Sequence, residues 1–185
     1  MMTLPNILTL SRILVIPLVV ACFYMEQPLG SHIAFLLFSL AGITDFFDGY
    51  LARASGTVSA LGRFLDPIAD KLMVGAVLIG LTAVDWISGV HVIAAIIILC
   101  REILVSGLRE FLAQLQVGVP VTMLAKWKTT VQMFALAGLT WSAGGPAIGI
   151  PAQETGLILL WIASVLTLYT GFDYLKAGLK HMVDK

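Results

Sequence analysis

Apolar residues run through the chain in six long segments, separated by short breaks rich in turn-forming residues. The segments cover roughly residues 6–25, 31–52, 61–83, 89–114, 121–142 and 154–175. A helix of about 20 apolar residues is long enough to cross the hydrocarbon core of a membrane, and each segment is close to that length. Glycine and proline mark the breaks near residues 28–30, 54–56, 118–120 and 144–146. The pattern predicts an all-α, polytopic integral membrane protein with six transmembrane helices, folded as one domain over residues 1–185.

Composition supports a membrane protein and excludes other classes. Hydrophobic residues make up 59% of the chain and charged residues only 12%, with a mean hydropathy of +0.97. An ordinary soluble domain contains about 25% charged residues. The net charge is zero, so nucleic acid is not an expected partner. Cys22 and Cys100 lie inside apolar segments with no CxxC or histidine partner nearby, so we interpret both as small apolar residues.

The placement of charged residues predicts how the segments are oriented. Lysine and arginine favour the cytoplasmic ends of membrane spans. The breaks after the first, third and fifth segments contain Glu26, Asp85 and Glu154 but no lysine or arginine. The basic residues near the other ends are Arg12, Arg53, Arg63, Lys126, Lys128, Lys176, Lys180 and Lys185. Both termini are therefore predicted to face the cytoplasm.

Four aspartates flank the break between the second and third segments. Asp45 and Asp48 share one helical face with Gly49 and Ala52, at the spacing i, i+3, i+4, i+7. In the third segment Gly62, Asp66 and Asp70 follow the row i, i+4, i+8. Each face thus combines two carboxylates with residues that leave the backbone accessible to a ligand.

The two segments are antiparallel, so the four carboxylates should meet at similar depth in a polar cavity open to the cytoplasmic side. Four clustered anions must take up protons or bind cations. Ligands with oxygen alone favour hard ions, and two Mg²⁺ or Mn²⁺ ions would cancel the charge. Two alternatives are structural ion pairs with Arg53, Arg63 and Lys71, and a divalent-cation transporter. A transport site, however, usually lies near the bilayer midplane between related repeats, and the motif has no second copy here.

The spacing of these residues resembles the signature of the CDP-alcohol phosphotransferase family. The matching pattern is Asp45-x2-Asp48-Gly49-x2-Ala52-Arg53-x8-Gly62-x3-Asp66-x3-Asp70. The resemblance implies that Asp45, Asp48 and Asp66 hold metal, and that Asp70 lies near the metal and acts as general base. It also implies that Asp48, Gly49, Ala52, Arg53, Gly62 and Asp66 line the site for the CDP moiety, and that the protein is a homodimer using CDP-diacylglycerol.

A second set of cations bears on the acceptor. Arg101 and Arg109 lie in the fourth segment and Lys126 and Lys128 open the fifth, so they can face the same cavity. An acceptor that carries a phosphate would account for this positive charge. Alternatively, Glu102 and Glu110 neutralise the arginines as local pairs, and Lys126 only extends to the membrane interface.

Three stretches are similar to those of bacterial family members that use glycerol 3-phosphate and make phosphatidylglycerophosphate. They are Arg101-Glu102-Ile103 with Leu108-Arg109-Glu110, Lys126 to Gln132, and Pro5 to Arg12, which adds Asn6, Thr9 and Arg12 as weaker site candidates. The resemblance implies an enzyme in the inner membrane of a bacterium, with its active site facing the cytoplasm. A cardiolipin synthase or an inositol-phosphate transferase of the same fold remains an alternative, because charge alone does not separate these acceptors.

Overall fold

The computed structural model describes residues 4–55, 60–114, 116–117 and 122–183, and it describes the backbone alone for residues 4–6, 46, 48–55, 60–61, 63, 147–148, 177 and 180–183. Its elements are α1 (Leu4–Cys22), α2 (Leu29–Ser55), α3 (Ala60–Ala83), α4 (His91–Gln114), α5 (Met123–Thr140), a 3₁₀ turn η1 (Gly145–Ile148) and α6 (Ala152–Val183). The described residues form no β-strand. The predicted all-α class is confirmed, with one long helix for each predicted segment.

Most helix ends lie a few residues from the predicted ones, and local packing explains two of these differences. The last helix, α6, runs to Val183, beyond the expected end at residue 175. Its extra turns pack on α4, since a Cβ built on Gly178 would meet the side chain of Leu108. At the other end of the bundle α2 begins at Leu29, so Gly30 lies inside the helix, where the carbonyl of Cys22 approaches it closely. Apolar periodicity does not report such contacts.

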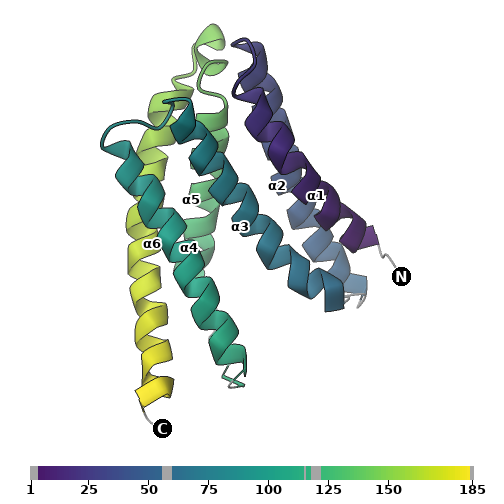
Figure 1. The fold of residues 1–185 in the computed structure, drawn as a ribbon, viewed down its shortest axis with the longest axis vertical. Helices are drawn as coiled ribbons and strands as arrows, with labels where there is room; N and C mark the ends of the chain where they lie inside the picture. The colour runs from purple at the N-terminus through teal and green to yellow at the C-terminus, as the bar shows by residue number, and fades with distance from the viewer. Residues whose placement is uncertain (1–3, 56–59, 115, 118–121, 184–185) are drawn as a thin grey trace.

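The helices run alternately up and down. Both termini lie at one end of the bundle, and the connections after α1, α3 and α5 lie at the opposite end (Figure 1). The connections without lysine or arginine are thus gathered at one end, as the charge pattern requires. This arrangement also makes α1 and α3 parallel neighbours, while α2 is antiparallel to both.

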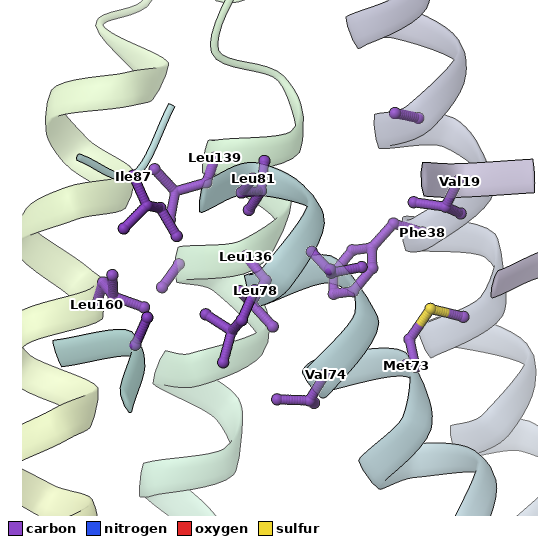
Figure 2. Close-up of a cluster of buried hydrophobic side chains, with 14 of the residues drawn as sticks. Val19, Phe38, Met73, Val74, Leu78, Leu81, Ile87, Leu136, Leu139 and Leu160 are labelled. Atoms are coloured by element: carbon purple, nitrogen blue, oxygen red, sulfur yellow. The ribbon is translucent and has the colours of Figure 1, made fainter. Parts of the chain in front are cut away.

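The core joins two groups of helices. One group is α1, α2 and α3, the other is α4, α5 and α6, and α3 contacts α4 and α5 of the second group. Figure 2 shows buried side chains from both groups meeting in the middle, among them Val19, Phe38, Met73, Leu136 and Leu160. The side chains of this cluster are buried, so the cluster fixes how the two groups sit against each other.

The surface is apolar and several buried residues are polar or charged, which reverses the usual arrangement of a soluble protein. Leu14, Phe134 and Val165 are 71%, 65% and 62% exposed, whereas Arg12 and Lys128 are 4% and 3% exposed. Within the part of the chain that the structure describes, two helical stretches are long and apolar enough to cross a membrane: His91–Gln114, with mean hydropathy 2.0, and Ala152–Lys176, with 1.7. Shorter apolar stretches cover Ile7–Cys22 and Leu29–Asp45. Six crossings and their orientation remain predictions.

Candidate active site

Three of the four predicted aspartates have described side chains, and all three gather beside α1. Arg12 of α1 contacts the Oδ1 atoms of Asp45 and Asp70 through one nitrogen, Nη1, at 2.5 Å and 3.1 Å. Thr9, one turn earlier on α1, donates a hydrogen bond of 2.6 Å to Oδ1 of Asp66. Because α1 and α3 run parallel, Thr9 and Arg12, one turn apart on α1, face Asp66 and Asp70, one turn apart on α3. Asp45 of α2 and Asp70 of α3 therefore meet at one guanidinium, and Asp66 lies one turn away on α3.

The remaining residues of the donor motif are only partly described. Gly62 is buried in the first turn of α3, one turn before Asp66. The side chains of Asp48, Gly49, Ala52 and Arg53 lie outside the described residues, as does that of Asn6. Their backbone continues α2 through Ser55, so the expected helical spacing of Asp45, Asp48 and Ala52 is present.

The donor set agrees with a hard divalent cation, although it is incomplete without Asp48. Asp45, Asp66 and Asp70 offer carboxylate oxygens, which Mg²⁺ and Mn²⁺ prefer. Among the side chains that the structure describes, no three acidic, histidine or cysteine residues form a group that could hold a metal ion. The guanidinium of Arg12 lies against two of the carboxylates. The metal assignment remains a prediction.

Three of the four cations predicted for the acceptor form one network between α4, α5 and α6. Lys128 and Arg101 both donate to Oε1 of Glu102, and the Arg101 bond is 3.3 Å long. The other terminal nitrogen of Arg101, Nη2, donates to Thr170 of α6 at 3.2 Å. Two cations therefore share one carboxylate, which leaves an excess of positive charge at a site that excludes most solvent. An anionic ligand would be stabilised there.

Arg109 is held by Tyr174, a residue that is 4% exposed. Nη2 of Arg109 donates to the Tyr174 hydroxyl at 2.8 Å, and the guanidinium carbon lies 4.8 Å from the centre of the ring. The guanidinium carbon of Arg101 lies 5.9 Å from the centre of the same ring. A cation over an aromatic face is stabilised by the ring quadrupole. Tyr174 thus places both arginines, whereas Lys126 is exposed in the first turn of α5.

Arg101 and Arg109 line a cavity of about 490 Å³ between α3 and α4, whereas Lys126 and Lys128 are not among its lining residues. Its charged lining residues are Lys71, Arg101, Glu102, Arg109 and Glu110. The α3 side contributes Pro67 and Lys71, and each directly follows an aspartate of the acidic group in the chain. Cavity and acids therefore flank the same two turns of α3, at the end of the bundle where the termini lie. The volume is typical of a site for a small molecule.

Comparison with known proteins gives the family. A sequence model of CDP-alcohol phosphatidyltransferases matches residues 2–169. This chain belongs to the CDP-alcohol phosphatidyltransferase family. A protein of Rickettsia bellii is 52% identical over 178 residues, covering 96% of both chains. Proteins of Cereibacter sphaeroides and Haemophilus influenzae are each 39% identical, over 99% and 98% of this chain and 98% and 96% of their own length. All three are named CDP-diacylglycerol–glycerol-3-phosphate 3-phosphatidyltransferase.

Membership of the CDP-alcohol phosphatidyltransferase family confirms the resemblance drawn from the aspartate motif. Three polar residues near the cavity, however, were not among the predicted site residues. Lys71 was considered only as an ion-pair partner of the aspartates, yet its Nζ donates to the Pro67 carbonyl at 3.0 Å. Thr170 and Tyr174 lie on α6, a segment treated only as a membrane span. Their spacing with Thr167, at i, i+3 and i+7 in an otherwise apolar helix, is the signal that could have revealed a polar face.

Proposed function

We propose that this chain transfers the phosphatidyl group from CDP-diacylglycerol to glycerol 3-phosphate, giving phosphatidylglycerophosphate and CMP. The observation that carries the proposal is the 52% identity to a protein of that name. The alignment spans 178 of the 185 residues and therefore contains both the acidic group and the cationic cavity. Such identity across both sites supports the acceptor as well as the donor.

The acidic group would bind the donor. We infer that Asp45, Asp48, Asp66 and Asp70 hold two Mg²⁺ or Mn²⁺ ions, which when bound would polarise the pyrophosphate and stabilise the departing CMP. The contacts of Asp45 and Asp70 with Arg12, the contact of Asp66 with Thr9 one turn away, and the oxygen chemistry of the three acids support this role. Gly49, Ala52 and Gly62 leave room for the CDP moiety to approach the backbone, and the planar fork of Arg53 suits a phosphate oxygen.

Asp70 would act as the general base. Asp70 lies one turn further along α3 than Asp66. Its side chain is 56% exposed, so an incoming hydroxyl can reach it. Its carboxylate would accept the proton from a hydroxyl of glycerol 3-phosphate. That oxygen then bonds to the phosphorus bearing the diacylglycerol, and the bond from this phosphorus to the oxygen of CMP breaks.

Glycerol 3-phosphate would occupy the cavity between α3 and α4. Its phosphate would be bound by Arg101 and Arg109, which line the cavity, and by Lys128, which shares the carboxylate of Glu102 with Arg101. Lys126, exposed in the first turn of α5, stays a weaker candidate. The shared carboxylate of Glu102 and the ring of Tyr174 hold these cations in place before the substrate arrives, which lowers the ordering cost of binding. Because Pro67 and Lys71 line this cavity, the acceptor would lie beside the turns of α3 that bear Asp66 and Asp70.

We further infer six crossings of a bacterial inner membrane, cytoplasmic termini and a homodimer. The exposed apolar side chains and the absence of lysine and arginine from residues 84–90 support the first two. Single cysteines at Glu26 and Gln116, in a chain with Cys22→Ala and Cys100→Ala, can be labelled in intact cells with an impermeant maleimide. Labelling of residue 26 alone is expected, and labelling of residue 116 would reverse the orientation. Light scattering in detergent would give the subunit number.

An acceptor assay tests the reaction. Purified protein with Mg²⁺ or Mn²⁺ and CDP-diacylglycerol is offered glycerol 3-phosphate, phosphatidylglycerol or an inositol phosphate, and release of CMP is measured. We expect turnover with glycerol 3-phosphate, abolished in Asp70→Asn. Turnover with either other acceptor alone would transfer the assignment to a cardiolipin synthase or an inositol-phosphate transferase. Metal flux into sealed liposomes without any nucleotide lipid, and no turnover, would favour a transporter.

A further inference from the structure

Arg12 is a buried cation that lies among the carboxylates of the acidic group. Its side chain is 4% exposed, although it comes from α1, outside the aspartate motif. Burying a guanidinium costs several kcal/mol unless anions neutralise it, on the order of the penalty for any buried ion. Asp45 and Asp70 supply that charge, from α2 and α3 respectively. Arg12 therefore ties three helices together through the two acids.

Arg12 contacts carboxylate oxygens that a metal ion could also use. Both contacts are made to Oδ1, at 2.5 Å for Asp45 and 3.1 Å for Asp70. A Mg²⁺ ion requires carboxylate oxygens at about 2.0–2.1 Å, in a nearly ideal octahedron. A guanidinium nitrogen between the same oxygens occupies that space, and its charge repels a second cation. A metal ion bound through both Oδ1 atoms would therefore require the guanidinium to move.

A displaced guanidinium would have another anion within reach. The donor carries a pyrophosphate, and under the proposed function this pyrophosphate binds to metal held by the same aspartates. Arginine matches phosphate oxygens with two parallel hydrogen bonds, which makes it a good partner for that group. Thr9, one turn away on the same helix, remains bonded to Asp66 and can keep α1 in register.

This inference rests on the proposed metal-dependent transfer. We infer that Arg12 competes with the divalent cation for Asp45 and Asp70. The guanidinium leaves these aspartates when metal binds and then pairs with the phosphates of the nucleotide donor. Arg12 thereby lowers the affinity for metal alone and raises the affinity for the nucleotide in the presence of metal. Metal and donor binding become mutually dependent, because each favours the same position of the guanidinium.

Replacing Arg12 should raise the affinity for metal and lower the affinity for the nucleotide. A purely structural role of Arg12 does not predict opposite changes in these two affinities. Mn²⁺ binding to the full-length protein in detergent is measured by electron paramagnetic resonance of free Mn²⁺, for wild type, Arg12→Gln, Arg12→Lys and the control Lys71→Gln. Lys71 carries the same charge beside Asp70, but its Nζ bonds to the Pro67 carbonyl. Arg12→Gln should bind Mn²⁺ about fivefold more tightly or better, and Lys71→Gln should change affinity less than about twofold.

CDP binding at saturating Mn²⁺ gives the second readout, and here Arg12→Gln should bind more weakly than wild type. Equal or weaker Mn²⁺ binding by Arg12→Gln, or an equal gain in Lys71→Gln, would overturn the inference while leaving the proposed function in place. Wild type that binds no Mn²⁺ would instead refute the proposed metal site, and the inference with it. Should Arg12→Gln not fold, Arg12→Lys decides: lysine keeps the charge on a shorter side chain that reaches the two acids less well, so a smaller gain in Mn²⁺ affinity is expected, and no gain refutes competition.

Discussion

Arg109 of α4 donates a hydrogen bond of 2.8 Å to the hydroxyl of Tyr174 on α6, with the guanidinium lying over the tyrosine ring. The ring also faces Arg101, so one residue orients two of the cations proposed to bind the acceptor phosphate. α6 therefore takes part in the site although it contributes no charge to the described network. Arg101 and Arg109 would touch the acceptor, whereas Tyr174 would only position them. Steady-state kinetics can distinguish these two roles.

The hydroxyl of Tyr174 should affect the acceptor alone. Tyr174→Phe keeps the ring and the packing, so the thermal midpoint should change little. The lost hydrogen bond is worth about 0.5–1.5 kcal/mol, so KM for glycerol 3-phosphate should rise roughly two- to tenfold. Steady-state kinetics with each substrate varied in turn measures this. Tyr169→Phe, at an exposed tyrosine of the same helix, is the control; an equal rise there, or an equal rise in KM for the lipid donor, would contradict the positioning role.

Glu102 should be needed more for stability than for the chemistry. Glu102→Gln leaves Arg101 and Lys128 without their shared carboxylate, and removing one partner of a buried pair costs about 3–5 kcal/mol. The thermal midpoint in detergent should fall clearly. Glycerol 3-phosphate should restore more of it than in wild type, because its phosphate replaces the missing anion. Glu110→Gln, at an exposed position of the same cavity, should show neither effect. No added stabilisation by glycerol 3-phosphate would argue against an anion site.

Asp70 should separate catalysis from metal binding. Asp70→Asn keeps an oxygen ligand but removes the base, so kcat should fall about 10²- to 10⁴-fold. Asp48→Asn should lose more of its Mn²⁺ affinity than Asp70→Asn does. Turnover and Mn²⁺ binding, measured on the same preparations, give the comparison. Full activity of Asp70→Asn would refute its role as base.

The sequence predicted the six helices and the acids that share a helical face, because both follow from local periodicity. Span-length apolar runs determine the helices, and the spacing i, i+4 determines which acids share a face. Arg12 and Tyr174 depend instead on which helices become neighbours. Parallel packing of α1 on α3 brings Arg12 to Asp70, and the face of α6 turned toward α4 brings Tyr174 to Arg109. Sequence periodicity shows which residues share a face, but not which helix that face will contact.

Lys126 and Lys128 were predicted together, and the structure gives them different surroundings. Lys128 is 3% exposed and bonded to Glu102, whereas Lys126 is exposed. Lys128→Met should therefore raise KM for glycerol 3-phosphate at least about tenfold, as expected for the loss of a charged hydrogen bond. Lys126→Met should raise it far less, since charges exposed to solvent are screened. Similar effects of the two variants would mean that the acceptor binds nearer the end of α5.

Gly171 offers a test of the site without changing any charged group. A Cβ built there would lie 3.1 Å from Cγ of Arg101, closer than a comfortable contact. Gly171→Ala should therefore shift the stem of Arg101 by a few tenths of an ångström. Alanine also favours the helix by about 1 kcal/mol, so the variant should remain folded while KM for glycerol 3-phosphate rises. Gly178→Ala meets Leu108 instead and provides the matched control. A rise in KM confined to Gly171→Ala would place the acceptor phosphate at Arg101, whereas no change in either variant would exclude Arg101 from that site.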